Sequence, residues 1–289
     1  MTSADWPAPA KLNLFLHVLG RRVDGYHDLQ TVYQLIDLAD LLCFEIRDDG
    51  RIRRVSGPTD IPAESDLAVR AARQLQAASG TRIGADIRLM KRIPVHGGLG
   101  GGSSDAATAL VALNEVWGLG WDADRLALLG RELGADVPLF VHGRSAWAAG
   151  TGDQLAPVVL PERHFAIVFP GLGVSTAEIF QAPELTRNSP KTTIRAFLKA
   201  GGRNDCAPVA MRRYPEVARA MAWLGQRGDA RLTGTGSCVF ADFPDRAHAE
   251  AALADLPRGW SAYVARGLDR SPLQQRLAAE RVSRDGRGG

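Results

Sequence analysis

A glycine-rich run at residues 94 to 105, Pro-Val-His-Gly-Gly-Leu-Gly-Gly-Gly-Ser-Ser-Asp, constrains the fold of this chain more than any other stretch. Five of the six residues from 97 to 102 are glycine, which lets the backbone adopt positive φ angles and gather its N–H groups in one concavity. Ser103 and Ser104 then stand where a helix is expected to begin, with its body over residues 106 to 117. Since a helix start has unpaired N–H groups and a partial positive charge, the run predicts a phosphate-binding loop.

Two common nucleotide-binding motifs do not match this run. A P-loop requires Gly-Lys-Ser or Gly-Lys-Thr, and the chain contains no Gly-Lys pair. The dinucleotide fingerprint Gly-x-Gly-x-x-Gly fails because Ser103 stands where the third glycine is required. A merely flexible loop is the remaining alternative, but a glycine costs about 1 kcal/mol in an ordered element and usually has a reason. The phosphate-binding interpretation is therefore preferred.

Composition bounds the class of protein. The 289 residues, 45% of them hydrophobic, suffice for one large or two medium domains, and no stretch approaches eighteen apolar residues. The first nine residues lack the features of a signal peptide, so we expect a soluble cytoplasmic protein that does not bind membranes. The cysteines (Cys43, Cys206 and Cys238) lie far apart, which favours reduced thiols over a disulfide or a zinc site. A net charge of +3 with scattered arginines does not indicate a nucleic-acid-binding surface.

Candidate functional side chains precede the glycine-rich run. Residues 11 to 18 alternate between apolar and other side chains, which predicts a half-buried strand with Lys11 and Asn13 on one face. That face either holds a polar ligand or is a solvated edge. An Asp-Gly turn leads to Tyr26 and His27, where the aromatic ring could stack on a planar base or merely pack across a hairpin.

Further candidates follow the run. Asp136 lies between a helix stop at Gly134 and an apolar segment, and it either has a chemical role or caps a helix. A second glycine-rich turn lies at residues 233 to 237. We expect two domains, residues 1–158 and 159–289, with a polar tail that is frayed from about residue 276.

Several motifs together resemble a known family. Residues 94–105 resemble the phosphate-binding motif of the galactokinase, homoserine kinase, mevalonate kinase and phosphomevalonate kinase (GHMP) superfamily, and residues 234–237 resemble its third motif. The Pro-Ala-Lys-Leu-Asn-Leu stretch at 9–14 and Gly-Tyr-His at 25–27 resemble the branch that phosphorylates a cytidine diphosphate-linked methylerythritol. The combination is specific, whereas one of these motifs alone would be weak.

The resemblance implies a fold and a reaction. It implies an α+β fold with an N-terminal domain like domain 2 of ribosomal protein S5, a C-terminal ferredoxin-like α/β domain, and the active site in the cleft between them. It implies transfer of the ATP γ-phosphoryl group to the 2-hydroxyl of the methylerythritol unit, in the non-mevalonate isoprenoid pathway. Asp136 matches the general base and Lys11 the lysine beside it. Mg²⁺ is expected to bridge the phosphates near Ser103 or Ser104, without a metal site built from protein side chains alone.

The resemblance also implies which residues bind each substrate. Two residues, Lys91 and Asp66, would contact the adenine of ATP. The ATP phosphates would be held by residues of the glycine-rich run, namely Pro94, Gly97, Gly98, Leu99, Gly100, Gly101, Gly102, Ser103 and Ser104. Tyr26 and Phe180 would sandwich the cytosine, and His27 would read its edge. The other acceptor-binding residues would be Asn13, Thr176, Gly234, Thr235 and Gly236.

Two alternatives remain open at this point. One is a GHMP kinase for another small alcohol, such as homoserine or mevalonate, although these acceptors have no base to stack. The other is a nucleic-acid-binding module, which would leave the glycine-rich run without a purpose. We expect a small-molecule kinase that binds no nucleic acid and is a monomer or a homodimer.

Overall fold

The computed structural model describes residues 5–59 and 61–285. Its strands are β1 (Trp6–Arg21), β2 (His27–Arg47), β3 (Ile52–Ser56), β4 (Gly84–Met90), β5 (Ala146–Ala149), β6 (Gln154–Pro157), β7 (His164–Phe169), β8 (Arg231–Leu232), β9 (Val239–Phe243) and β10 (Ser261–Leu268). The helices are η1 (Ala63–Ser65), α1 (Leu67–Ser79), α2 (Gly101–Val116), α3 (Ala123–Arg131), α4 (Val137–His142), α5 (Thr176–Gln181), α6 (Ile194–Ala200), α7 (Ala207–Arg213), α8 (Pro215–Gly225), α9 (Arg246–Ala251) and α10 (Pro272–Asp285).

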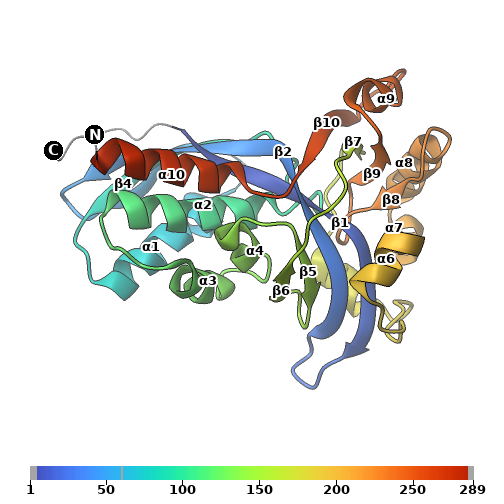
Figure 1. The fold of residues 1–289 in the computed structure, drawn as a ribbon, viewed down its shortest axis with the longest axis horizontal. Helices are drawn as coiled ribbons and strands as arrows, with labels where there is room; N and C mark the ends of the chain where they lie inside the picture. The colour runs from blue at the N-terminus through green and yellow to red at the C-terminus, as the bar shows by residue number, and fades with distance from the viewer. Residues whose placement is uncertain (1–4, 60, 286–289) are drawn as a thin grey trace.

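The long antiparallel hairpin β1–β2 connects the two halves of the molecule (Figure 1). β2 pairs with β1, β4, β5 and β10, and β10 continues through β7 and β9 to β8, so that one sheet extends through both halves. Helices α1 to α4 and α10 gather on the N-terminal half, and α6 to α9 lie in the C-terminal half. The hairpin can therefore contribute side chains to any site between the halves.

The strand predicted at residues 11 to 18 lies inside β1, but the expectation of a half-buried strand was wrong. Both faces of this segment are buried, Leu12 and Val18 on one face and Lys11, Asn13 and Phe15 on the other. The reason is tertiary, because the C-terminal half packs against the face that carries Lys11, Asn13 and Phe15. The Phe15 ring, for example, packs against that of Phe197, with the ring centroids 4.9 Å apart.

Helix α1 is bounded by two local features of the sequence. The Asp66 side chain accepts a hydrogen bond from the backbone N–H of Ala68 and caps its start, and Gly80 ends it at φ +70°. Helix α2 begins at Gly101, slightly before the start predicted at Ser103 and Ser104, and includes most of the body predicted over residues 106 to 117. Ser103 and Ser104 therefore lie within its first turn, and the last glycines of the run belong to the helix.

The C-terminal end of the chain returns to the N-terminal half. β10 pairs with β2 at Ile36 and Leu35, and α10 then packs against β1 and α2. The expectation of a frayed tail from about residue 276 is wrong as far as Asp285, because packing against these elements holds the segment as helix. Residues 286–289 lie outside the described residues. The division at residue 158 stays a prediction.

Candidate active site

A cleft of about 700 Å³ lies between the two halves. Its wall combines β1, the glycine-rich run, the start of α4, helix α5 and the turn at residues 233–237. Nearly all the residues predicted to bind ATP line it; Ser104 does not. Of the residues predicted to bind the acceptor or act in catalysis, the lining includes Lys11, Asn13, Asp136, Thr176, Phe180, Gly234 and Thr235. Tyr26, His27 and Gly236 lie outside that lining.

The glycine-rich run is fixed against the second glycine-rich turn by backbone contacts. Gly98 and Gly100 have φ angles of +78° and +75°, as the glycine content predicted. A Cβ atom on Gly98 would lie 2.3 Å from the carbonyl oxygen of Thr233. The Thr233 hydroxyl donates to the Gly98 carbonyl at 3.3 Å, and the Cys238 N–H donates to the Gly97 carbonyl at 3.0 Å. Because the two backbones touch, a side chain at Gly98 cannot be accommodated.

The first turn of α2 leaves backbone donors available in the cleft. Gly100 is the N-cap residue, and no side chain caps the helix. The first hydrogen bond of the helix runs from the Ser104 N–H to the Gly100 carbonyl. The N–H groups of residues 101 to 103 consequently have no acceptor within the helix. Such a helix start favours a bound phosphate.

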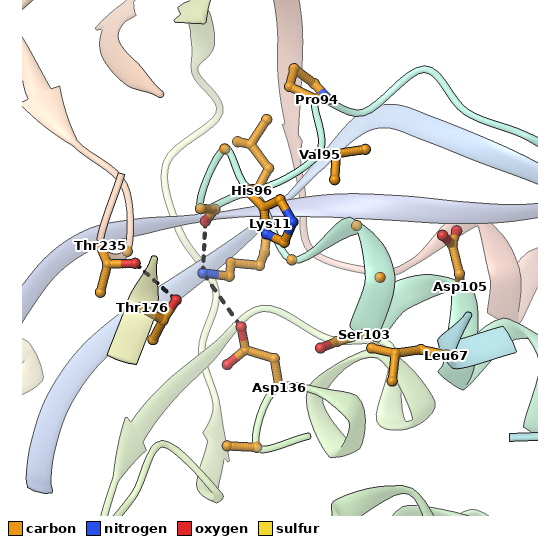
Figure 2. A pocket seen from close by; sticks show the side chains of 18 of the residues that line it. Lys11, Leu67, Pro94, Val95, His96, Ser103, Asp105, Asp136, Thr176 and Thr235 are labelled. Atoms are coloured by element: carbon orange, nitrogen blue, oxygen red, sulfur yellow. Dashed lines mark hydrogen bonds and ion pairs between the residues drawn. The ribbon is translucent and has the colours of Figure 1, made fainter. Parts of the chain in front are cut away.

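The two serines of this turn are in different surroundings. Ser103 lines the cleft, and its hydroxyl is visible there in Figure 2. Ser104 is fully buried, and within the part of the chain that the structure describes its Oγ has no hydrogen-bond partner. Of the pair, Ser103 is the one whose hydroxyl can meet a ligand.

Lys11 and Asp136 face each other across the cleft (Figure 2). The Lys11 Nζ lies 3.5 Å from Asp136 Oδ2 and donates to Asn13 Oδ1 and, at 3.0 Å, to the Gly98 carbonyl. Asp136 precedes α4 but makes no capping hydrogen bond with its side chain. Its carboxylate therefore belongs to the cleft, not to the helix cap that the sequence left possible.

Tyr33 is a site residue that the sequence interpretation missed. Its hydroxyl donates to Asp136 Oδ1 at 2.9 Å, and its ring is buried. Burial raises the pKa of Tyr33, and the nearby Asp136 carboxylate raises it further, so the phenol keeps its proton and remains a donor. No sequence motif marks Tyr33. It reaches the site because the β1–β2 register sets it opposite Asn13.

Polar residues from three further segments adjoin this pair. The Asn13 amide donates to Thr31 Oγ1 at 3.0 Å, and its backbone N–H donates to Thr233 Oγ1 at 3.0 Å. The hydroxyls of Thr176 and Thr235 lie 3.1 Å apart, and both residues line the cleft (Figure 2). The predicted polar residues from both halves thus converge around one position.

The aromatic residues predicted to hold a base are partly assembled. The rings of His27 and Phe180 stack with their centroids 5.2 Å apart. Tyr26 is 66% exposed, and it has no ring contact among those of the described residues. Burial lowers the pKa of His27, and the charges of Arg187 and Arg21 lower it further. The imidazole is therefore neutral near pH 7.

The two residues predicted at the adenine line the cleft, and both are held by ion pairs. Asp66 accepts from Ala68 as the α1 cap and from the Arg54 guanidinium at 2.7 Å. The Lys91 Nζ lies between two carboxylates, 2.5 Å from Asp40 and 2.7 Å from Asp105.

The carboxylates around Lys91 are buried and close together. Burial raises the pKa of Asp105. Burial alone would lower the pKa of Lys91, but Asp105 and Asp40 outweigh it and raise that pKa. Asp40 is fully buried and also accepts from the backbone N–H groups of Arg92 and Ile93. This carboxylate, which sequence reasoning missed, anchors the segment that leads into the glycine-rich run.

The part of the chain that the structure describes contains no cluster of three or more His, Cys, Asp or Glu side chains arranged for a metal ion. None of the described helices is long and apolar enough to cross a membrane.

Comparison with known families defines the class. Residues 66–144 match the GHMP kinases N terminal domain, and residues 184–262 match the GHMP kinases C terminal domain. A crystal structure of mevalonate kinase shares the fold, with a TM-score of 0.66 at 16% identity over 93% of this chain and all of that chain. The expected two-domain α+β GHMP kinase fold is confirmed.

Individual relatives narrow the class. The 4-diphosphocytidyl-2-C-methyl-D-erythritol kinase of Halorhodospira halophila is 55% identical, covering 94% of this chain and 96% of its own, and that of Alkalilimnicola ehrlichii is 54% identical, covering 98% and 97%. A crystal structure of 4-(cytidine 5'-diphospho)-2C-methyl-D-erythritol kinase gives a TM-score of 0.81 at 36% identity and covers 91% of this chain and 99% of that chain. The chain belongs to the 4-diphosphocytidyl-2-C-methyl-D-erythritol kinase family.

Proposed function

We propose that this chain transfers the γ-phosphoryl group of ATP to the 2-hydroxyl of 4-diphosphocytidyl-2-C-methyl-D-erythritol, giving the 2-phosphate and ADP, in the non-mevalonate isoprenoid pathway. The observation that carries the proposal is the Lys11–Asp136 pair, which faces the glycine-rich run in one cleft. The names of the relatives supply the acceptor.

Asp136 is the general base in this proposal. Its carboxylate accepts the proton of the 2-hydroxyl while the hydroxyl oxygen attacks the γ-phosphorus and ADP leaves. That hydroxyl is a tertiary alcohol and a poor nucleophile, so a positioned base is needed. The Lys11 ammonium favours the ionised form of the Asp136 carboxylate and stabilises the negative charge that develops on the transferred phosphoryl group. Tyr33 restrains one carboxylate oxygen and leaves the other directed to the Lys11 side.

The glycine-rich run holds the ATP phosphates. The free N–H groups at the start of α2 supply backbone donors, and the helix dipole favours the negative charge. The oxygen donors of the cleft fit Mg²⁺, which takes one or two protein oxygens together with phosphate oxygens. Ser103 is the residue whose hydroxyl would hold the ion. When bound, Mg²⁺ neutralises charge on the transferring phosphates.

The far end of the cleft binds the cytidine of the acceptor. Phe180 offers a ring face already in contact with His27. Tyr26, adjacent to His27 in the chain and exposed, supplies the second face when the base is bound. Each stacked ring contributes about 1 to 3 kcal/mol. Asn13 and the Thr176–Thr235 pair contact the polar part of the acceptor between the two ends. Since both substrates are soluble and highly charged, we propose a cytoplasmic location.

An acceptor panel tests the proposed function. Purified protein with ATP and Mg²⁺ is expected to release ADP only when 4-diphosphocytidyl-2-C-methyl-D-erythritol is present, with the product identified as the 2-phosphate by mass spectrometry and ³¹P NMR. Homoserine and mevalonate are tested separately as alternative acceptors. Asp136→Asn protein prepared in parallel should be nearly inactive, which excludes a contaminating kinase as the source of the activity. Comparable turnover with homoserine or mevalonate contradicts the acceptor assignment. Salt-sensitive RNA binding without any turnover would favour the nucleic-acid-binding alternative.

A further inference from the structure

The loop between α5 and α6 carries a side chain that connects His27 to Phe180, a residue of the cleft lining. The Arg187 guanidinium donates through Nε to His27 Nε2 at 3.0 Å. Through Nη2 it donates to the carbonyls of Phe180 at 2.9 Å and Ala182 at 2.7 Å, and through Nη1 to the carbonyl of Leu185 at 3.1 Å. One side chain thus ties the first residue of β2 to the end of the short helix that presents Phe180.

These hydrogen bonds determine the protonation of His27. Arginine has donors only, so His27 Nε2 must be an acceptor, and a neutral imidazole then carries its proton on Nδ1. Protonation of Nε2 would oppose two donors and place two positive charges together. Two charged groups face the ring, Arg187 from the loop and Arg21 from the end of β1. Both are cationic, so both disfavour the imidazolium form.

Arg187 is not among the residues that line the cleft, and its guanidinium donates to His27 and to backbone carbonyls. We propose that Arg187 is a positioning residue for acceptor specificity: it holds His27 against Phe180 and fixes the His27 proton on Nδ1, so that a pyrimidine base meets a preformed aromatic wall. Preformation matters because ordering side chains during binding reduces affinity. This inference rests on the proposed function, since the base belongs to the proposed acceptor.

The inference makes a specific kinetic prediction. Loss of Arg187 is expected to weaken binding of the acceptor without altering Lys11 and Asp136, to which the Arg187 side chain makes no hydrogen bond. In Arg187→Gln protein, KM for the cytidine-linked acceptor should rise about 10-fold or more, while kcat at saturation and KM for ATP stay within about 2-fold. Arg195→Gln removes the same charge from an exposed position on α6 and is the matched control.

A spectroscopic measurement separates positioning from a general structural role. In ¹⁵N-labelled wild-type protein, His27 Nδ1 should carry the proton and Nε2 should have the shift of an unprotonated ring nitrogen. In Arg187→Gln protein, the His27 pKa should rise towards its ordinary value of 6.5, because one cation and its hydrogen bond are gone. The pH below which KM for the acceptor rises should then be higher than in the wild type and in the Arg195→Gln control.

Each outcome supports or overturns the inference. A wild-type His27 with its proton on Nε2 overturns it, whether or not any variant folds. A folded Arg187→Gln protein with unchanged acceptor KM and unchanged His27 titration also overturns it. Failure of the proposed function has a different signature, namely wild-type protein that does not phosphorylate the cytidine-linked acceptor at all. An equal loss of kcat for Arg187→Gln and Arg195→Gln would reduce Arg187 to a structural residue.

Discussion

The two ends of the cleft are built in different ways. The phosphate end consists of backbone from one continuous run, with Gly98 and Gly100 at positive φ and the first turn of α2 directly after them. The acceptor end consists of side chains from β1, the start of β2, helix α5 and the turn at residues 233–237. A chain segment can encode the first end by itself, whereas the second exists only after the halves have packed. Lys11 and Asp136 lie between the two ends and serve both substrates.

The largest effect is expected where the two ends meet. Asp136→Asn should lower kcat about 10²-fold or more, because an amide cannot accept the hydroxyl proton, while acceptor and ATP binding remain nearly intact. Steady-state kinetics and calorimetric titration with the acceptor check this. Asp124→Asn, at an exposed position in α3, is the control and should retain wild-type activity. An unchanged kcat in Asp136→Asn protein would remove Asp136 from the role of base.

The next effect isolates the phosphate end. Gly98→Ala should lower the free energy of unfolding by about 3 kcal/mol and raise KM for ATP, because its Cβ meets the Thr233 carbonyl and the φ angle is strained. Gly120→Ala is the matched control, since Gly120 has φ +68° with nothing within 4 Å of its Cβ. That control should cost only about 1 kcal/mol. If urea denaturation shows that Gly98→Ala and Gly120→Ala lower the free energy of unfolding equally, the contact between the two glycine-rich turns is not tight.

A smaller effect tests the restraint on the base. Tyr33→Phe removes the hydroxyl that donates to Asp136 and leaves the ring in place. We expect kcat to fall about tenfold, with KM for both substrates changed by less than about twofold, since the hydroxyl orients the carboxylate and need not bind either substrate. Steady-state kinetics with each substrate varied in turn provide the check. A rise in acceptor KM with unchanged kcat would instead assign Tyr33 to acceptor binding.

The smallest effect concerns stability as a function of pH. Burial lowers the pKa of His17 and of His27, so between their ordinary value of 6.5 and their lower native values the unfolded chain binds more protons than the folded one. The contribution of these two histidines to the free energy of unfolding should therefore decrease as the pH falls from about 7 to about 5.5, whereas Asp105, whose pKa is raised by burial, contributes in the opposite sense. Urea titrations of wild-type and His27→Gln protein at several pH values isolate the His27 part as the difference between the two proteins. A difference that does not change with pH over this range would contradict these surroundings for His27.

The contrast between the two ends of the cleft also explains which structural features could be predicted from the sequence. The positive φ angles at Gly98 and Gly100 were predicted, and the cap at Asp66 and the stop at Gly80 likewise follow from local chemistry. The burial of both faces of β1 could not be predicted, because it depends on packing between the halves.

The residues that sequence reasoning missed have the same explanation. Tyr33 and Arg187 lie in no motif, and only strand register and loop packing bring them to Asp136 and His27. The prediction of a frayed tail was wrong because helix α10 is stabilised by contacts with β1 and α2, not by its own composition.

The central claim is that the phosphate end defines the reaction and the acceptor end selects the cytidine. The most direct test compares kcat/KM for 4-diphosphocytidyl-2-C-methyl-D-erythritol with that for 2-C-methyl-D-erythritol 4-phosphate, which has the same hydroxyl but no cytidine. With two rings contributing about 1 to 3 kcal/mol each, kcat/KM should fall at least about 30-fold without the cytidine, while KM for ATP is unchanged. Equal values of kcat/KM for the two acceptors would contradict this account.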